Sequence, residues 1–299
     1  MSETRRGALF GAAAYLLWGL FPLYFPLLDP AGPIEVLAHR IGWSLVVMTA
    51  IVLVLKRQAG VRAAFADRRR LAMLTAAAFV LAVNWGIYIY GVTSDQVVET
   101  SLGYFINPLV TVLLGVVVLG ERLRPAQWAA LAVAAVAVVV LTVENGSPPW
   151  IALALAVSFG TYGLLKKTVG VGAVEGLAVE TAVLAPVALI YLGWLSTTGD
   201  ATFAANGPGH AALIALTGVV TAVPLLFFAA AAARVPLTTL GLMQYLAPTM
   251  QFLLGVLVFS EPLGLLKLVG FCLVWAALIA FTVDLVTHVR RQIPVAEPV

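Results

Sequence analysis

Long apolar segments separated by short polar ones dominate this chain. Backbone groups cannot hydrogen-bond to lipid, and the alternation of β-barrel strands is absent from the sequence, so such segments are expected to cross a bilayer as helices. Each segment reaches or approaches the ~20 residues that a helix needs to span the hydrocarbon. We therefore predict an all-α membrane protein with ten transmembrane helices, at about residues 7–28, 34–55, 71–92, 97–119, 126–144, 150–166, 175–195, 211–233, 237–259 and 265–286.

The composition argues against a soluble protein. The chain is 62% hydrophobic and 10% charged, which leaves too few polar groups to cover a water-exposed surface. A single cysteine, Cys272, cannot form an internal disulfide. The sequence contains no phosphate-binding loop, metalloprotease motif, nucleophile elbow or Cys/His cluster, so we predict no enzyme, no cofactor and no metal.

The basic residues indicate an orientation. With the N-terminus inside, 15 of the 17 lysines and arginines fall in cytoplasmic segments, the exceptions being Lys267 near an outer loop and Arg40 within a span. Both termini are therefore predicted to be cytoplasmic. Because the basic residues lie in loops between apolar segments, membrane lipids rather than nucleic acid are their expected partners. The first segment exceeds the apolar core of a signal peptide, so we predict that it is retained.

A sequence repeat with an offset of 140 residues divides the chain into two units. Eight of sixteen positions match between residues 108–123 and 248–263, and the segment around Glu35 matches that around Glu175 at the same offset. The unit holds five predicted spans, an odd number, so its second copy would enter the membrane from the opposite side. We predict one repeat in residues 7–144, an inverted repeat in 150–287 and a cytoplasmic tail in 288–299. The alternative is a duplicated scaffold that does not move.

Five motifs in or beside the predicted spans carry a family resemblance. They are AHRIGWS at 38–44, SLGYFINPLV at 101–110, LGERL at 119–123, TAVPL at 221–225 and QYLAPT at 244–249. Together they resemble the RarD-type permeases in the EamA branch of the drug/metabolite transporter superfamily, over nearly the whole chain. The resemblance implies ten helices in two inverted halves around a central cavity, in the bacterial plasma membrane, with export as the expected direction. It implies no particular substrate.

Polar residues within spans are costly in lipid and therefore mark candidate solute-binding positions. In the span 97–119, four of them share one helical face: Thr100, Tyr104, Asn107 and Thr111. Through the repeat, Tyr104 corresponds to Gln244 and Thr111 to Gln251 in the span 237–259. Two such stripes would line one cavity, and the alternative is hydrogen bonding between helices without a ligand. Pro108 and Pro248 occupy equivalent points and are predicted to kink both helices.

Further candidates lie near the middle of other spans. They are Tyr15 and Trp18 in the first span, Asn84 and Tyr88 in the third, and Tyr162 in the sixth. Aromatic rings at these depths would stack on a planar or apolar solute. Packing between helices is the alternative role for each of them.

Arg40 is the most costly residue of the chain. It lies six residues into the span 34–55, with His39 beside it and Glu35 one turn before His39. The functional interpretation is an anion site formed by Arg40, or a proton-coupling site that includes Glu35 and His39. The alternative is a snorkelling arginine or a structural ion pair of Arg40 with Glu35, Asp95 or Glu99.

Glu180 is the repeat equivalent of Arg40, and it is a candidate for proton coupling. The two lie near opposite faces of the membrane, so each needs its own partner; Lys166 or Lys167 would serve Glu180. Glu121 and Glu261 end equivalent spans, and a structural role in the turn is expected for both. The basic segment 57–70 would rest on anionic lipid headgroups or form a solvated loop.

These features predict a secondary transporter that moves a small organic solute by alternating access. The sequence contains no nucleotide-binding motif, so a gradient of the solute or of protons would supply the energy. Two alternatives stay open, an uncoupled facilitator and a membrane receptor or scaffold without transport. The residues also leave the substrate and the oligomeric state open.

Overall fold

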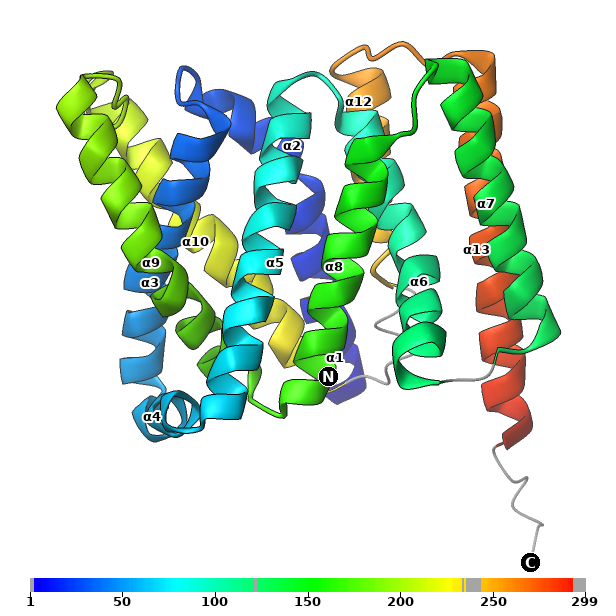
Figure 1. Ribbon diagram of the computed structural model, residues 1–299, viewed down its shortest axis with the longest axis horizontal. Helices are drawn as coiled ribbons and strands as arrows, with labels where there is room; N and C mark the ends of the chain where they lie inside the picture. The colour runs from blue at the N-terminus through cyan, green and yellow to red at the C-terminus, as the bar shows by residue number, and fades with distance from the viewer. Residues whose placement is uncertain (1–2, 121–122, 233, 235–242, 293–299) are drawn as a thin grey trace, which may run out of the picture.

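The computed structural model describes residues 3–120, 123–232, 234 and 243–292, and in these ranges it is a bundle of helices without strands (Figure 1). The first half contains α1 Glu3–Gly19, α2 Phe21–Tyr24, the 3-10 helix η1 Phe25–Leu28, α3 Pro33–Val54, α4 Gln58–Ala66, α5 Arg68–Thr93, α6 Val97–Leu119 and α7 Pro125–Asn145. The second half contains α8 Trp150–Val169, α9 Ala173–Thr198, α10 Gly207–Ala232, α12 Leu246–Leu257 and α13 Leu265–Gln292. Glu121, the first residues of the expected ninth span and the tail beyond Gln292 lie outside the described residues.

The all-helical membrane protein expected from the sequence is confirmed. Among the described residues, seven helices are long and apolar enough to cross a membrane, and the pair Arg5–Gly19 and Phe21–Leu28, bent by 41°, makes an eighth candidate. Two shorter apolar helices, Trp150–Lys166 and Leu246–Leu257, occupy the places expected for the sixth and ninth spans. A count of ten crossings therefore depends on including these two.

The two prolines at equivalent sequence positions have different structural roles. Pro108 lies inside α6, which continues through it to Leu119. Pro248 lies in the first turn of α12, which begins at Leu246. A proline in a first turn removes an N–H that has no partner within the helix, so it does not interrupt the helix there. The kinks expected at the two prolines stay a prediction, because residues 235–242 of the expected ninth span lie outside the described structure.

Local sequence signals explain other helix ends. The Asp67 side chain accepts hydrogen bonds from the backbone N–H groups of Arg69 and Arg70, at 3.0 and 3.1 Å, and so caps the start of α5. At the other end of a helix, α9 stops at Gly199, whose φ of +82° is a left-handed conformation that glycine adopts without steric cost.

Most of the basic segment 57–70 is helical rather than a solvated loop, because α4 covers Gln58–Ala66 and α5 begins at Arg68. In α4, Ala64 is buried and Val61 packs with it in a cluster that includes Val169 and Val179, so the apolar side of α4 faces protein. At its start, Arg57 pairs with Glu175 at 3.2 Å. The segment is thus held against α9 by both apolar and ionic contacts.

Helices far apart in sequence lie side by side in the bundle. Figure 1 shows α7 beside α13 at one edge, with α3, α9 and α10 gathered at the opposite edge. Between them, α6 packs on α8 and α12, α5 packs on α8, and α1 packs on α10 and α12. The start of α1, the helix α4 and the end of α13 lie at the same end of the bundle (Figure 1).

Small residues allow close helix contacts. Gly218 on α10 lies so near α3 that an added Cβ would stand 2.5 Å from the carbonyl oxygen of Trp43. Without a strong hydrophobic force between helices in lipid, such close backbone approach is a main source of association. It fixes α10 against α3, and these two helices supply the central contact of the candidate site.

Candidate functional site

Arg40 lies about two turns into α3, and 4% of its surface is exposed. Its Nε donates a hydrogen bond of 2.9 Å to the Oγ1 of Thr221 on α10, 181 residues away. Thr221 in turn donates to the carbonyl of Thr217 at 2.8 Å. The hydroxyl that holds Arg40 is therefore itself fixed by its own helix.

Aromatic rings surround the Arg40 guanidinium. Its Cζ lies 4.1 Å from the ring centroid of Trp85 on α5, 5.5 Å from Phe21 on α2 and 5.8 Å from Phe25 on η1. The Phe25 ring also meets Tyr88 edge-on at 5.9 Å. An aromatic ring presents a negative face to a cation. Trp85, Phe21 and Phe25, called the ring cage below, therefore stabilise the guanidinium without neutralising it.

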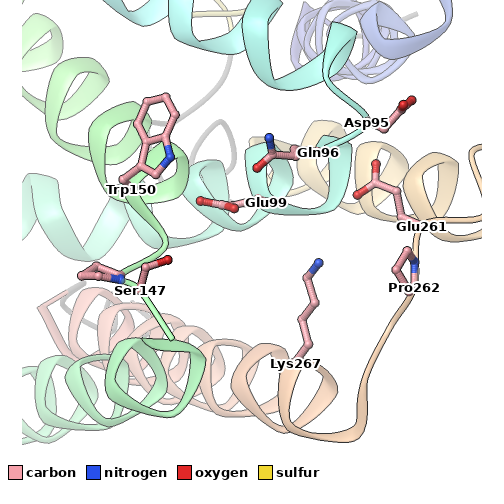
Figure 2. A pocket seen from close by; sticks show the side chains of 9 residues that line it. Asp95, Gln96, Glu99, Ser147, Trp150, Glu261, Pro262 and Lys267 are labelled. Carbon is pink, nitrogen blue, oxygen red and sulfur yellow. The ribbon is translucent and has the colours of Figure 1, made fainter. Parts of the chain in front are cut away.

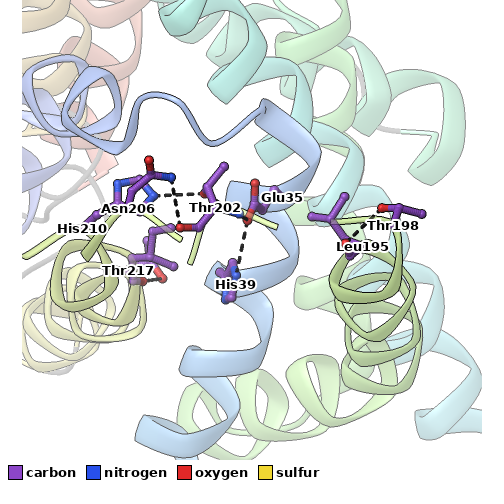
Figure 3. Close-up of polar contacts among 9 residues, drawn as sticks. Glu35, His39, Leu195, Thr198, Thr202, Asn206, His210 and Thr217 are labelled. Atoms are coloured by element: carbon purple, nitrogen blue, oxygen red, sulfur yellow. Dashed lines mark hydrogen bonds and ion pairs between the residues drawn. The ribbon is translucent and has the colours of Figure 1, made fainter. Parts of the chain in front are cut away.

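The structural ion pair considered for Arg40 is absent from the described structure. Glu35 accepts hydrogen bonds from the backbone N–H and the hydroxyl of Thr202, at 2.7 and 3.0 Å, and lies 3.9 Å from His39 (Figure 3). Glu99 accepts the backbone N–H of Ile151 at 3.0 Å. These carboxylates hold the ends of helices and loops, and Arg40 has the ring cage instead.

Glu35 and His39 belong to a polar cluster where α3 meets the segment between α9 and α10. The hydroxyl of Thr202 lies 3.0 Å from Nε2 of His210, and the His39 ring stacks on Phe203 at 4.9 Å. Figure 3 shows Glu35 and His39 on α3 facing this segment. The contacts fasten the start of α3 to the loop that follows α9.

Several buried polar atoms lack a hydrogen-bond partner within the described part of the chain. They are Nη1 of Arg40, Oγ of Ser44, the hydroxyl of Tyr88, Nδ2 of Asn107 and Oε1 of Gln251. Buried polar groups nearly always have a hydrogen-bond partner, so these exceptions indicate positions where a ligand or water would bind. Four of these five atoms belong to residues that the sequence singled out as binding candidates.

Asn84 joins three helices. Its Nδ2 donates to the Leu155 carbonyl at 3.1 Å and to the Ser158 hydroxyl at 2.9 Å, both on α8. Its Oδ1 accepts from the hydroxyl of Tyr104 on α6 at 3.3 Å. Asn84 is fully buried, and its amide is occupied by protein groups.

Tyr104 and Tyr88 bring the first-half stripe next to the ring cage. Their ring centroids lie 5.7 Å apart, and Tyr104 also meets Phe159 edge-on at 5.9 Å. One helical turn along α6, the Oδ1 of Asn107 accepts from the hydroxyl of Thr111 at 2.9 Å. Thr111 itself is exposed.

The second-half candidates gather around α1. The Nε2 of Gln251 donates to the carbonyl of Trp18 at 3.1 Å, and Trp18 meets Tyr15 edge-on at 5.4 Å. Both rings also contact Phe228 on α10. Gln244, half-buried just before α12, is not part of this group of contacts.

Glu180 has the partner that the sequence allowed for it. Lys166 Nζ donates to its Oε1 at 2.7 Å, and the hydroxyl of Tyr162 donates to its Oε2 at 3.2 Å. The Glu180 side chain has no exposed surface. Both carboxylate oxygens are therefore bound, and Tyr162 is part of this pair rather than of the ring cage.

Two pockets lie outside these groups of candidates. One, of about 290 Å³, is lined by charged and polar residues including Asp95, Glu99, Glu261 and Lys267 (Figure 2). Glu261 accepts the backbone N–H groups of Val97 and Val98 at 2.6 and 3.0 Å, so it caps α6. Burial raises the pKa of its carboxyl, while these hydrogen bonds and Lys267 act to lower it. The structural role expected for Glu261 is what the geometry shows.

The second pocket is an apolar groove of about 260 Å³ between the α1–α2 region and α10. It is lined by Leu17, Leu20, Phe21, Tyr24, Val219, Val220, Val223 and Pro224. Phe21 belongs to both the groove and the ring cage. Tyr24 connects the two sides of the groove, because its hydroxyl donates a hydrogen bond of 2.5 Å to the carbonyl of Leu213 on α10.

Sequence reasoning did not select the ring cage itself. Trp85, Phe21 and Phe25 are aromatic residues in an aromatic-rich membrane protein, and their spacing carries no signal of a cation. Thr221 was noted only within the TAVPL motif. The described residues contain no group of three or more His, Cys, Asp or Glu side chains arranged to hold a metal.

Long apolar helices and a ring-bound arginine inside the bundle define a multi-pass membrane protein with a polar centre. Residues 5–143 match the EamA-like transporter family. Over 291 residues the chain is 54% identical to Protein RarD of Streptomyces exfoliatus, covering 97% of this chain and 92% of that protein. It is 40% identical over 289 residues to Protein RarD of Escherichia coli (strain K12), covering 97% and 98%.

A third relative, the Chloramphenicol-sensitive protein RarD of Pseudomonas aeruginosa, is 31% identical over 296 residues. The alignment covers 98% of each chain. A solved crystal structure shares the fold, with a TM-score of 0.59 and 22% identity over 96% of this chain and 99% of that one. The chain belongs to the EamA-like transporter family, as a RarD-type permease of the drug/metabolite transporter superfamily. It is a bacterial multi-pass membrane protein, and a transporter rather than an enzyme.

Proposed function

We propose that this permease is a secondary transporter that exports a small organic solute by alternating access, with ten spans arranged as two inverted five-helix repeats. Helices that correspond through the 140-residue offset have corresponding neighbours. The contact of α6 with α8 has its counterpart in α12 with α1, and that of α5 with α8 in α10 with α1. The pairs α3–α9, α6–α12 and α7–α13 each join a helix to its own counterpart. This pattern is what a pseudo-two-fold axis produces.

Two details support the inversion. Corresponding helices run in opposite directions in Figure 1, as α3 and α9 do. Gly19 faces Met250 of α12, while Gly160 faces Val110 of α6, and residues 110 and 250 are 140 positions apart. A glycine of α1 thus contacts α12 and a glycine of α8 contacts α6, so each of these contacts joins the two halves.

The observation that carries alternating access is a difference between two equivalent positions. Thr111 is exposed, whereas Gln251, its counterpart, has 2% of its surface exposed. Inverted repeats transport by exchanging the conformations of their halves. In the exchanged state Gln251 would be exposed and Thr111 buried.

We assign the solute contacts to the candidates with free polar atoms. Arg40, Tyr88, Asn107 and Gln251 would bind it directly. The remaining candidates would shape the surrounding pathway: Tyr15, Trp18, Asn84, Tyr104, Tyr162 and Gln244. We place both termini in the cytoplasm. Arg57 and the arginine of α4 then lie on the cytoplasmic side, where basic residues are enriched in membrane proteins.

An uncoupled facilitator is the second candidate function. Both oxygens of Glu180 are engaged by Lys166 and Tyr162, so proton transfer at Glu180 would first have to break a buried ion pair. Glu35 and His39 are the other candidates for proton coupling, and they contact the loop after α9 at Thr202 and Phe203 respectively. Flux that is intact but unaffected by a pH gradient would favour the facilitator.

Cysteine accessibility tests the mechanism. On a Cys272→Ser background, Thr111→Cys and Gln251→Cys would be treated separately with a membrane-impermeant maleimide in intact cells and in inverted vesicles. We expect Thr111→Cys to react from the cytoplasmic side and Gln251→Cys from the outer side. A condition that raises the labelling rate of one variant should lower the labelling rate of the other. Rates that do not change in opposite directions would exclude alternating access at these positions.

A further inference from the structure

The partners of Arg40 in the described structure are all uncharged, so none of them neutralises its positive charge. The guanidinium has 4% of its surface exposed, and its hydrogen bond goes to a neutral hydroxyl, that of Thr221. Removing an ion from water is costly, and cation–π contacts return only part of that cost. The ring cage thus leaves much of the cost of burial uncompensated.

The described carboxylates near this region are committed to other partners. Glu35 is bound to Thr202, Glu180 to Lys166 and Glu99 to the start of α8. Arg40 forms no ion pair with any carboxylate in the described ranges, and its Nη1 lacks a hydrogen-bond partner there. A negative charge for this site would have to come from outside the described protein groups.

Two unused donors belong to residues that contact the same ring. Nη1 of Arg40 and the hydroxyl of Tyr88 are both buried without partners in the described structure. The Phe25 ring lies 5.8 Å from the guanidinium and 5.9 Å from the Tyr88 ring. A carboxylate has two acceptor oxygens and binds guanidinium and hydroxyl donors in charge-assisted hydrogen bonds.

The apolar groove next to the ring cage gives room for the rest of a molecule. Phe21 is shared by the two, and Val220 of the groove precedes Thr221, which holds Arg40. Its volume of about 260 Å³ is slightly below the ~300 Å³ at which pockets for drug-sized ligands begin. The groove wall is apolar, which suits a hydrocarbon or a single aromatic ring.

We propose that Arg40 and Tyr88 form a carboxylate subsite and that the transported solute is a small organic monocarboxylate with an apolar body. This inference rests on the proposed transport function and specifies its substrate class. A cationic solute would meet Arg40 as a like charge. The ammonium of a zwitterion would need an acidic partner, and the carboxylates discussed above are all engaged.

Three probes with one body and different head groups test the subsite: 3-phenylpropanoate, 3-phenylpropanamide and 3-phenylpropylamine. Their binding to the purified full-length protein in lipid nanodiscs would be measured by titration calorimetry. A charge-assisted pair is expected to favour the acid over the amide about tenfold or more, with the amine weakest. Equal binding of acid and amide, or no binding of any probe at millimolar concentration, would overturn the proposal.

Substitutions of Arg40 test whether this residue causes the preference for the acid. Arg40→Gln should abolish the preference for the acid, and Arg40→Lys should keep part of it, since lysine retains the charge but not the fork of donors. Arg57→Gln, at an exposed arginine, is the matched control and should keep the full preference. An Arg40→Gln protein that still prefers the acid would contradict the assignment. Should that variant not fold, the comparison of probes on the unaltered protein decides alone.

Flux separates this inference from the function on which it rests. The same acid would be followed in proteoliposomes. Selective binding of the acid without any flux would uphold the subsite and refute transport. Flux of other solutes, with no preference for the acid in binding, would uphold transport and refute the subsite.

Discussion

Glu261 accepts the backbone N–H of Val97 at 2.6 Å, so a carboxylate from the loop after α12 caps α6, a helix of the other half of the chain. A second bond, from Val98 at 3.0 Å, completes the cap. The start of α6 is thus fastened to the loop between α12 and α13. Contacts of this kind between distant segments are the basis of the five predictions below.

Glu261→Ala should lower stability by about 1–3 kcal/mol, because two N–H groups lose their acceptor. Glu261→Gln should cost less, since its amide oxygen still accepts. Unfolding temperatures in detergent at pH 7 would show this order. If the alanine variant were as stable as the original, Glu261 would contribute little as a cap.

The stability of the protein should also depend on pH through Glu261. Burial raises the pKa of its carboxyl above the ordinary 4.5, so folding favours the protonated form. The contribution is fully present below pH 4.5 and is lost as pH rises through the raised value. The unfolding temperature of the protein minus that of Glu261→Gln should therefore fall as pH rises from about 4 to 7. A difference that rises with pH would reverse the assigned sign.

Lys166→Met should be strongly destabilising, by about 3 kcal/mol, because it leaves Glu180 buried and unpaired. Adding Glu180→Leu should restore most of that loss, since an apolar pair replaces a buried ion pair at little cost. A double-mutant cycle on unfolding would measure the coupling. Additive losses would mean that the 2.7 Å pair is energetically unimportant.

Gly218→Ala should separate α3 from α10, because its Cβ would stand 2.5 Å from the Trp43 carbonyl oxygen. We expect a loss of about 1–3 kcal/mol, as for overpacking elsewhere. The control is Gly42→Ala in α3, where nothing lies within 4 Å of the added Cβ. It should be neutral or stabilising by up to about 1 kcal/mol. Equal unfolding temperatures for the two variants would contradict the close contact.

Asn84→Leu should cost about 1–3 kcal/mol, since it breaks the contacts of Asn84 with α8 and leaves the hydroxyl of Tyr104 without its acceptor. Asn206→Leu, at an exposed position, should change stability by less than about 0.5 kcal/mol. If Asn84 serves mainly to join helices, transport per folded molecule should change less than the folded yield. A full loss of transport in a stable Asn84→Leu protein would instead make it a solute contact.

The sequence anticipated the helices because crossing a bilayer is a local requirement. The span expected at 97–119 is α6, and that expected at 34–55 is α3 to within a residue at either end. The helix α4 was left open between a loop and a lipid-bound segment, since its partner, α9, lies more than a hundred residues further along. Segment length and hydropathy do not specify such a neighbour.

For the candidate site, the sequence determined which residues are out of place in lipid, among them Arg40, Tyr88 and Gln251. It did so because an ionic or polar side chain in an apolar helix costs free energy wherever the helix lies. Only the tertiary structure decided the partners of Arg40, which meets Thr221 and Trp85 rather than Glu35. For Glu180 it selected Lys166 from the two lysines that the sequence had offered. Partners are set by how helices distant in sequence pack, and that packing fixes which buried charge is compensated and which is left for a ligand.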